Sequence, residues 1–421
     1  MVLLLLVYFL CNTLLFVNGI NPDVLLNTEE RIKKDGYPVE IHQVTTEDGY
    51  IFNLFRIPHG LEKQENEPKN KSAVLFVTGH GGIPKHFLLL GKKLAAAYYF
   101  ADRGFDVWLF CYRGVDCQNP KKHKKLNWNK NPTYWDFSFH EVGVYDLPAS
   151  IDLILNVTGQ KKIFNVVHSS GGSIVYALLS EKPEYNDKIK IIANYAGGVI
   201  TYEVDYPFVQ AIAQFSGVLK NVWKNLGMYE LMPGFMSDML GDTFRKMCAD
   251  PKWFRTCKVT LWTFGSHVST LIEDDVVDLA VSYFPRLPIK QVGHFADNLN
   301  RGDFRKFDYG PDKNMQVYGT RLPPRYNLSA INSPQAFFYG KTDTLSTKPD
   351  TQMLQGLVSN TILDYEVGPK FVHLDFLFAR NATQMVYEPT VKLFQDYDAG
   401  IVPKKIVRRK KKRADMYNNS Y

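Results

Sequence analysis

The chain has 421 residues, of which 45% are hydrophobic and 14% aromatic, and this composition excludes an intrinsically disordered protein. The formal net charge is +7, but eight lysines and arginines lie within residues 404–413, and subtracting them leaves −1 for the remainder. Because the body of the protein is close to neutral, we expect no basic groove and therefore no nucleic-acid partner.

The first 19 residues are almost entirely apolar and end in Asn18-Gly19, as at a signal-peptidase site. The run has no Lys or Arg, which leaves an uncleaved anchor as the alternative. However, Asn12 and Thr13 interrupt the run, and it is short for a bilayer span. We therefore predict a signal peptide at 1–19. No later stretch is long and apolar enough to predict a transmembrane helix.

The cysteine pattern agrees with an oxidising compartment. Besides Cys11, which would leave with the signal peptide, four cysteines form two closely spaced pairs, Cys111 with Cys117 and Cys248 with Cys257. Such spacing suits disulfides. Zinc is the competing interpretation, but neither a Cys-x-x-Cys pattern nor a histidine cluster accompanies these residues, so we expect no metal site.

Sequons for N-glycosylation also agree with secretion. They begin at Asn70, Asn156, Asn327, Asn381 and Asn418. Each sequon is short enough to occur by chance, so all five are candidates only.

After the signal peptide, alternating residues around a turn at Glu47-Asp48-Gly49 predict a β-hairpin within 21–60. Short apolar runs then recur, separated by helical patterns. Buried strands are predicted at 73–78, 105–110, 163–167, 189–195, 335–340 and 361–367. Because strands alternate with helices, we expect an α/β protein with a mostly parallel sheet.

This alternation stops between residues 201 and 324. The segment has helical tendency and is rich in methionine and aromatic residues, among them Phe208, Phe215, Trp223, Met228, Tyr229, Met232, Phe235, Met236 and Met239. Such residues usually form a core, but methionine-rich surfaces also adapt to flexible acyl chains. Composition alone leaves both interpretations open.

The strand 163–167 leads through a polar corner into a helical pattern that starts at Ser173. This strand–Ser–helix arrangement resembles the nucleophile elbow of α/β-hydrolases, with Ser169 at its tip and the backbone N–H of Ser170 beside an oxyanion. The usual pattern is Gly-x-Ser-x-Gly; Gly171 matches it, whereas Val167 replaces the first glycine. Ordinary turn chemistry is the alternative.

Two further polar residues follow later strands. Asp343 comes just after 335–340, where a carboxylate can orient a catalytic histidine, although an Asp in such a loop is more often a turn former. His373 follows the final strand, in the place that the fold reserves for the base. Ser169, Asp343 and His373 thus occur in the chain order of an α/β-hydrolase triad.

Longer runs resemble the acid lipases, the family of the gastric and lysosomal lipases. They are Asn21-Pro22, Gly36-Tyr37-Pro38, Glu47-Asp48-Gly49-Tyr50-Ile51, Arg56-Ile57-Pro58, Arg113-Gly114 and His373-Leu374-Asp375-Phe376. The resemblance spans about 21–403 and implies an α/β-hydrolase fold, in which helices flank the sheet and a mainly helical cap is inserted. The implied division is core at 20–200, cap and lid at 201–324, core at 325–403 and a disordered basic tail at 404–421.

The same resemblance implies roles for single residues. Ser169 would be the nucleophile, His373 the base and Asp343 its orienting partner. The N–H groups of Gly82 and Ser170 would bind the oxyanion, although the family usually carries an apolar side chain where this chain has Gly82.

The resemblance also bears on the cysteines and on cofactors. Cys248 and Cys257 have the spacing of the family's cap disulfide. Cys111 stands where the family has Asn, and only geometry decides whether it bonds to Cys117. No metal or organic cofactor is implied.

We therefore expect a secreted lipase or esterase, with a lysosomal location as the alternative. It would cleave acylglycerols or sterol esters through an acyl-enzyme, with a lipid–water interface as its partner. Neither its oligomeric state nor its acyl-chain preference follows from the sequence.

The other hypothesis is a lipid carrier with little turnover, and it rests on Val167 and Gly82. The basic tail would be solvated, attract acidic surfaces or be trimmed by a protease.

Overall fold

The computed structural model describes residues 23–406 except 24, 63–70, 80, 116, 118–121, 129 and 402, and, within 231–285, only residues 239, 243, 247–248, 253, 255–259, 269–273 and 276. The predicted signal peptide at 1–19, the sequons at Asn70 and Asn418, and the basic tail beyond residue 406 lie outside the described residues. The same holds for Met232, Phe235 and Met236 of the predicted cap.

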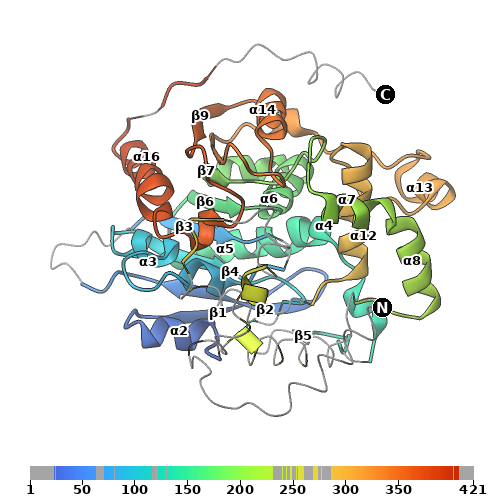
Figure 1. Ribbon diagram of the computed structural model, residues 1–421, viewed down its shortest axis with the longest axis horizontal. Helices are drawn as coiled ribbons and strands as arrows, with labels where there is room; N and C mark the ends of the chain where they lie inside the picture. Colours follow the sequence, from blue (N-terminus) through green and yellow to red (C-terminus); the bar gives the residue numbers. More distant parts are fainter. Residues whose placement is uncertain are drawn as a thin grey trace.

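A central sheet runs through the molecule (Figure 1). In the described part of the chain it has nine strands, in the order β1-β2-β4-β3-β6-β7-β8-β9, with β5 paired to β2. The strands are β1 (Glu40–Thr45), β2 (Tyr50–Ile57), β3 (Ala73–Val77), β4 (Asp106–Phe110), β5 (Lys122–His123), β6 (Ile163–His168), β7 (Ile189–Tyr195), β8 (Gln335–Tyr339) and β9 (Thr361–Glu366).

The predicted strands are all present, and the mostly parallel sheet is confirmed. β1 and β2 form the expected antiparallel hairpin, whereas the neighbours from β4 to β9 pair in parallel. Every residue of β3, β4 and β6 is buried. Strands covered on both faces need continuous apolar runs instead of alternation, which is why these segments were recognisable in the sequence.

Helices cover both faces of the sheet, as two neighbouring residues of β7 demonstrate. The Tyr195 hydroxyl donates to Thr390 on α16 (Glu388–Asp398) at 2.8 Å. The Asn194 side chain instead donates to Tyr176 on α6 (Gly171–Glu181) at 3.2 Å. Because successive side chains of a strand point to opposite faces, α16 and α6 lie on opposite sides of the sheet.

The remaining helices of the core are shorter or more peripheral. They are α2 (Thr28–Lys34), α3 (Ala96–Ala101), α4 (Phe139–Glu141), α5 (Leu147–Thr158), α14 (Lys348–Leu357) and α15 (Asp375–Phe378). Turns of 3₁₀ helix lie at Pro84–Leu88, Pro132–Trp135, Pro183–Lys188 and Leu328–Ala330, and π-helical turns at Val142–Asp146 and Thr383–Tyr387.

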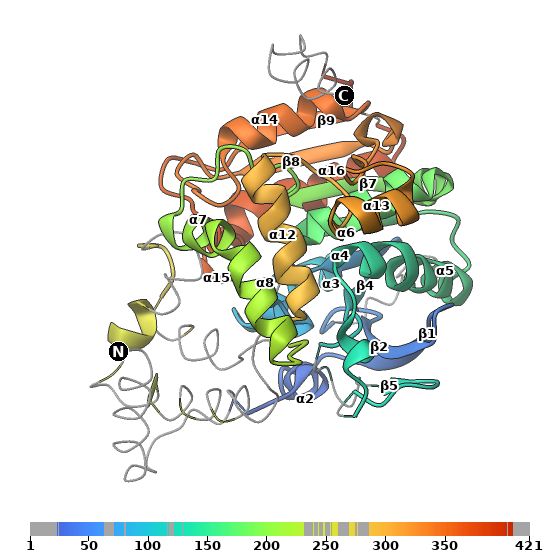
Figure 2. The ribbon, with the colours of Figure 1, turned by 90° about the vertical axis from the view of Figure 1, so that its right-hand side faces the viewer.

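The described residues between 201 and 324 form helices α7 (Pro207–Gln214), α8 (Ser216–Asn225), α12 (Ile289–Arg301) and α13 (Pro311–Tyr318). Figure 2 shows α8 and α12 side by side in front of the sheet. Contacts with the turn before α4 hold α12 on the core. The buried His294 hydrogen-bonds through Nδ1 to the Ser138 hydroxyl at 2.9 Å, and Lys290 forms an ion pair with Glu141 at 2.8 Å.

Three predicted sequons fall on described residues. Asn156 on α5 and Asn327 are exposed, whereas Asn381 is half-buried with its amide nitrogen 3.3 Å from the Met385 sulfur. None of the described helices combines the length and the apolar character that crossing a membrane requires.

Candidate active site

The corner between β6 and α6 holds Ser169 in a left-handed backbone conformation, with φ of 58°. This region is unfavourable for residues other than glycine. Backbone hydrogen bonds keep the corner in place. The Ser169 N–H donates to the Tyr195 carbonyl at 3.2 Å, and the Ser169 carbonyl accepts from Gly172 at 3.0 Å and Gly198 at 2.8 Å. The predicted elbow therefore has the sharp backbone geometry that presents a serine hydroxyl at the end of a sheet.

Close backbone contacts explain the glycines around this corner. A Cβ atom on Gly171 would lie 2.6 Å from the Val77 carbonyl oxygen, so no side chain fits there. A Cβ on Gly79 would lie 2.9 Å from the Ser169 Cβ and 2.8 Å from the Ser170 nitrogen. The sequence pattern identified Gly171 as part of the elbow, but it did not reveal that Gly79 packs directly against Ser169.

Val167, which replaces the first glycine of the pattern, lies inside the sheet. It pairs in register with Val77 of β3 and Asn194 of β7, and it is fully buried. The branched side chain is thus part of the core, and the corner two residues later retains its geometry.

His373 lies between the other two predicted triad residues. Its Nε2 atom is 2.8 Å from the Ser169 Oγ, and its Nδ1 atom is 2.9 Å from the Asp343 Oδ2. His373 and Asp343 are 5% and 3% exposed. The loops after β6, β8 and β9 therefore bring the three residues into one hydrogen-bonded row, in which Asp343 accepts from Nδ1–H and Nε2 accepts the serine proton.

The carboxylate at the end of this row is fixed by its own loop. The Asp343 Oδ1 accepts the backbone N–H groups of Leu345 at 2.9 Å and Ser346 at 3.0 Å. These bonds leave Oδ2 directed at the imidazole. Asp343 is therefore both a turn residue and a partner of the histidine, the two interpretations that its position in the sequence allowed.

His168 holds the backbone of His373 in place, a role that the sequence did not predict. Its Nε2 is 2.9 Å from the carbonyl oxygen of His373, and the two rings lie 5.0 Å apart. Burial, with a smaller contribution from nearby His373, lowers the pKa of His168 to about 3. The His168 ring therefore stays neutral, and it donates a hydrogen bond to the backbone carbonyl of His373.

Asp375 also holds this backbone. Its Oδ2 accepts the Val372 N–H at 2.8 Å, and its Oδ1 accepts the hydroxyl of Ser269 from the predicted cap. Burial raises the pKa of Asp375 to about 6, in opposition to these two hydrogen bonds, and the negative charge of Asp343 raises it further. A titratable carboxyl thus links the cap segment to the His373 loop.

Of the two predicted oxyanion donors, Ser170 directly follows Ser169, and Gly82 hydrogen-bonds to Gly79, which packs against Ser169. The Gly82 N–H donates to the Gly79 carbonyl at 3.0 Å in this conformation, and Ser170 is buried next to Gly79. A Cβ on Gly82 would lie 2.7 Å from the Thr78 Cβ. Thr78 therefore accounts for the glycine at a position where the acid lipases usually carry an apolar side chain.

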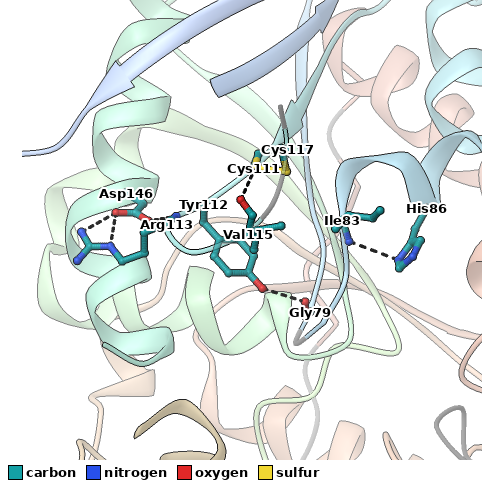
Figure 3. Close-up of a disulfide and its surroundings, with 9 residues drawn as sticks. All are labelled: Gly79, Ile83, His86, Cys111, Tyr112, Arg113, Val115, Cys117 and Asp146. Atoms are coloured by element: carbon teal, nitrogen blue, oxygen red, sulfur yellow. Dashed lines mark hydrogen bonds and ion pairs between the residues drawn. A yellow bond between two sulfur atoms is a disulfide. The ribbon is translucent and has the colours of Figure 1, made fainter. Parts of the chain in front are cut away.

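Both predicted cysteine pairs form disulfides. Cys111 is bonded to Cys117, with their Cα atoms 6.4 Å apart. Cys248 is bonded to Cys257, with their Cα atoms 5.6 Å apart. The first disulfide follows β4, and Figure 3 shows Tyr112, the residue after Cys111, with its hydroxyl directed at the Gly79 carbonyl.

Arg113, between the two cysteines of that loop, is 1% exposed. Its side chain binds Asp146 at 2.6 Å, and its backbone N–H donates to Asp146 at 2.9 Å (Figure 3). The side chain also binds Asp48 at 2.6 Å. These two carboxylates raise the pKa of Arg113, although its burial acts in the opposite direction. A buried cation with two carboxylates thus ties the loop after β4 to the β1–β2 hairpin and to the turn before α5. Among the described residues, no three His, Cys, Asp or Glu side chains lie together in a way that could bind a metal.

A left-handed serine at a strand–helix corner of a mostly parallel sheet, with a histidine and an aspartate from later loops, defines an α/β hydrolase. Two family models match the chain: the partial alpha/beta-hydrolase lipase region at residues 28–81 and the alpha/beta hydrolase fold at residues 73–207. The chain is 32% identical to Lipase 3 of Drosophila melanogaster, over 88% of this chain and 93% of that protein. It is also 32% identical to gastric triacylglycerol lipase of Bos taurus, over 89% and 93%.

Lipase member K of Homo sapiens is 31% identical over 90% of this chain and 93% of that protein. The chain belongs to the acid-lipase family, a family of carboxylic-ester hydrolases within the α/β hydrolases. The resemblance inferred from the sequence motifs is thereby confirmed.

Replacing Val167 with glycine tests whether the missing glycine impairs the elbow. Because Val167 is buried in an intact strand, we expect Val167→Gly to leave the esterase rate unchanged and to lower the free energy of unfolding by about 2–4 kcal/mol. The measurements are hydrolysis of a short-chain ester and denaturant unfolding. Val166→Gly, on the opposite face of β6, is the control; a rate increase in Val167→Gly alone would contradict this prediction.

Asp375 gives a prediction for stability as a function of pH. Its folded-state pKa of about 6 lies above the ordinary aspartate pKa of about 3.9, so folding takes up a proton. The carboxyl therefore favours the folded state below pH 4, and this contribution, at most about 3 kcal/mol, is lost as the pH rises through 6. We expect Asp375→Asn to flatten that part of the profile in thermal unfolding between pH 4 and 7. Parallel profiles for the parent and the variant would show that Asp375 does not titrate there.

Proposed function

We propose that this protein is a secreted or lysosomal serine hydrolase that cleaves the carboxylic esters of lipids, such as acylglycerols or sterol esters. The observation that carries the proposal is the hydrogen-bonded row of Ser169, His373 and Asp343. The gastric triacylglycerol lipase of Bos taurus, which is similar over nearly the whole chain, supports a lipid substrate.

The geometry suggests the following chemistry. His373 Nε2 takes the proton of Ser169 as the Oγ attacks the ester carbonyl, and a tetrahedral intermediate with a negative oxygen forms. The imidazolium, stabilised by Asp343, gives its proton to the leaving alcohol as the C–O bond breaks, and an acyl-enzyme remains. Water then repeats the sequence and releases the acid. The backbone N–H groups of Ser170 and Gly82 would stabilise the negative oxygen, each by about 3 kcal/mol.

A surface of α8 supports an interfacial role for the predicted cap. Val218 and Val222 share one side of α8, and Phe215 and Leu226 lie directly before and after the helix at the same spacing of three or four residues. Phe215, Val218, Val222 and Leu226 are 57%, 64%, 46% and 67% exposed. We call these four residues the α8 stripe. An apolar stripe of this kind suits contact with a lipid–water interface, at about 1.5 kcal/mol or more for each side chain that leaves water.

The route through an oxidising compartment is supported by the two disulfides, together with the signal peptide predicted at 1–19. Glycans would attach most readily at Asn156 and Asn327, whose side chains are exposed. Membership of the family supports a location outside the cell or in lysosomes, and a measurement of its location would decide between the two.

Replacing the proposed nucleophile tests the reaction itself. Ser169→Ala should lower kcat/KM on acylglycerol, sterol-ester and short-chain ester substrates by about 10³-fold or more, because the covalent step is lost. A phosphonate that traps active serines should label the parent at Ser169 and leave the variant unlabelled. Ser180→Ala, at the far end of α6, is the control and should keep the parent rate. Tight lipid binding by an unlabelled, inactive parent would instead support the carrier hypothesis.

The α8 stripe gives a separate prediction. Val218→Asp combined with Val222→Asp should lower the rate on emulsified acylglycerol by about tenfold and leave a soluble short-chain ester unaffected, because only the first reaction requires the interface. Val317→Asp on α13, whose side chain is 51% exposed, is the matched control. Equal losses on both substrates would count against an interfacial role.

A further inference from the structure

The carbonyl oxygen of Gly79 receives two donors. The Gly82 N–H donates to it at 3.0 Å, and the Tyr112 hydroxyl donates at 3.4 Å. Figure 3 shows the Tyr112 side chain reaching from the loop after β4 to Gly79. Gly79 is buried beside Ser169, so the hydrogen bonds to the Gly79 carbonyl affect the conformation of the loop next to the nucleophile.

This inference rests on the proposed function, in which the first donor, the Gly82 N–H, binds the oxyanion. To bind the oxyanion, the Gly82 N–H has to leave the Gly79 carbonyl. The loop has the backbone freedom for this, because Gly81 has a positive φ of 71° and neither Gly81 nor Gly82 carries a side chain. The obstacle is the Gly79 carbonyl, because a buried carbonyl left without a donor is unfavourable.

The second donor meets this need. A carbonyl oxygen has two lone pairs, so the Tyr112 hydroxyl can bind while Gly82 is present, and its distance of 3.4 Å is that of a weak second donor. Once Gly82 turns away, Tyr112 is the donor in position to satisfy the same oxygen. Hydrogen bonds that serve catalysis are often long before substrate binds and shorten afterwards.

The residues before and after Tyr112 in the chain are both fixed in place. Cys111 before it is disulfide-bonded to Cys117, and Arg113 after it is fixed by Asp146 through both its backbone and its side chain. Tyr112 itself is 3% exposed. The hydroxyl therefore stays near Gly79 while the glycine loop moves.

The cap also contacts this hydroxyl. Burial raises the pKa of Tyr112, and a hydrogen bond with the Gln291 side chain on α12 acts in the opposite direction. The Gln291 Oε1 atom is buried without a partner among the described residues. Gln291 places the cap helix next to the tyrosine that faces the oxyanion loop.

We propose that Tyr112 is a positioning residue, whose hydroxyl satisfies the Gly79 carbonyl when the Gly82 N–H turns to the oxyanion. The disulfide between Cys111 and Cys117 holds Tyr112 in place for this exchange. No covalent step is involved; one hydrogen bond replaces another on the same oxygen.

Tyr112→Phe in the full secreted chain tests the proposal. We expect kcat on a soluble short-chain ester to fall about tenfold while KM stays within about twofold, because only the state with the oxyanion needs the exchange. The rate of phosphonate labelling at Ser169 should fall by the same factor, since that reaction also places negative charge on an oxygen in the site. Tyr185→Phe removes a hydroxyl that donates to Asp152 at 2.7 Å on the protein's surface, and it should change neither rate.

Amide hydrogen exchange separates positioning from damage to the fold. Exchange at Gly82 requires its N–H to leave the Gly79 carbonyl, so loss of the supporting hydroxyl should slow that exchange in Tyr112→Phe. A merely structural role predicts faster exchange, as a loosened loop opens more often. If the parent neither hydrolyses esters nor reacts with the phosphonate, the proposed function fails. If the parent is active and Tyr112→Phe matches it in kcat, or exchanges faster at Gly82, the role of Tyr112 is overturned.

If Tyr112→Phe does not fold, the double variant Cys111→Ala with Cys117→Ala takes its place. Freed from its tether, Tyr112 should support the exchange less well, so kcat should fall while KM stays unchanged. A double variant with the parent kcat would overturn the proposal in the same way.

Discussion

The active-site geometry depends on the close approach of three backbone segments at Ser169. The left-handed conformation of this serine costs on the order of 1–2 kcal/mol, and hydrogen bonds from and to its own backbone hold it. The approach is possible only where side chains are missing, at Gly79 on one side and at Gly171 on the other. The sheet brings the ends of β3, β6 and β7 together at this point, and the loops that carry His373 and Asp343 lie next to it.

The loop after β4 is secured by two different means. The disulfide closes a short ring of chain, and Arg113 joins the ring to two distant carboxylates. Both charges of the Arg113–Asp146 pair are withdrawn from water, so removal of either residue would leave the other charge buried and uncompensated. The covalent bond limits how far the loop can move, whereas the ion pairs determine its orientation relative to the hairpin.

Much of this arrangement could be predicted from the sequence, because the informative features are local. Apolar runs mark strands that are buried on both faces, and the chain order of Ser169, Asp343 and His373 indicates the triad that the structure brings together. His168, Asp375 and Tyr112 received no role, because their partners lie far along the chain. Asp375 meets a side chain 106 residues away, and His168 meets a carbonyl 205 residues away. No local pattern encodes such contacts.

Other features needed coordinates for a steric reason. The sequence could not decide whether Cys111 and Cys117 bond, and the Cα separation of 6.4 Å permits it. Val167 looked like a defect in the elbow because a pattern records which residue is usual, but not how much space surrounds it. In the same way, the Thr78 side chain occupies the space that a side chain at position 82 would need, which the sequence does not show.

The 204 residues between Ser169 and His373 have a consequence for biosynthesis. A ribosome adding about 5–20 residues per second completes the elbow roughly 10 to 40 seconds before it adds the histidine. During that interval the emerging chain carries Ser169 without its hydrogen-bond partner His373 and without strand β9, which precedes His373 in the chain. The hydrogen-bonded row of Ser169, His373 and Asp343 can therefore form only after the C-terminal part of the chain has been made and β9 has paired with β8.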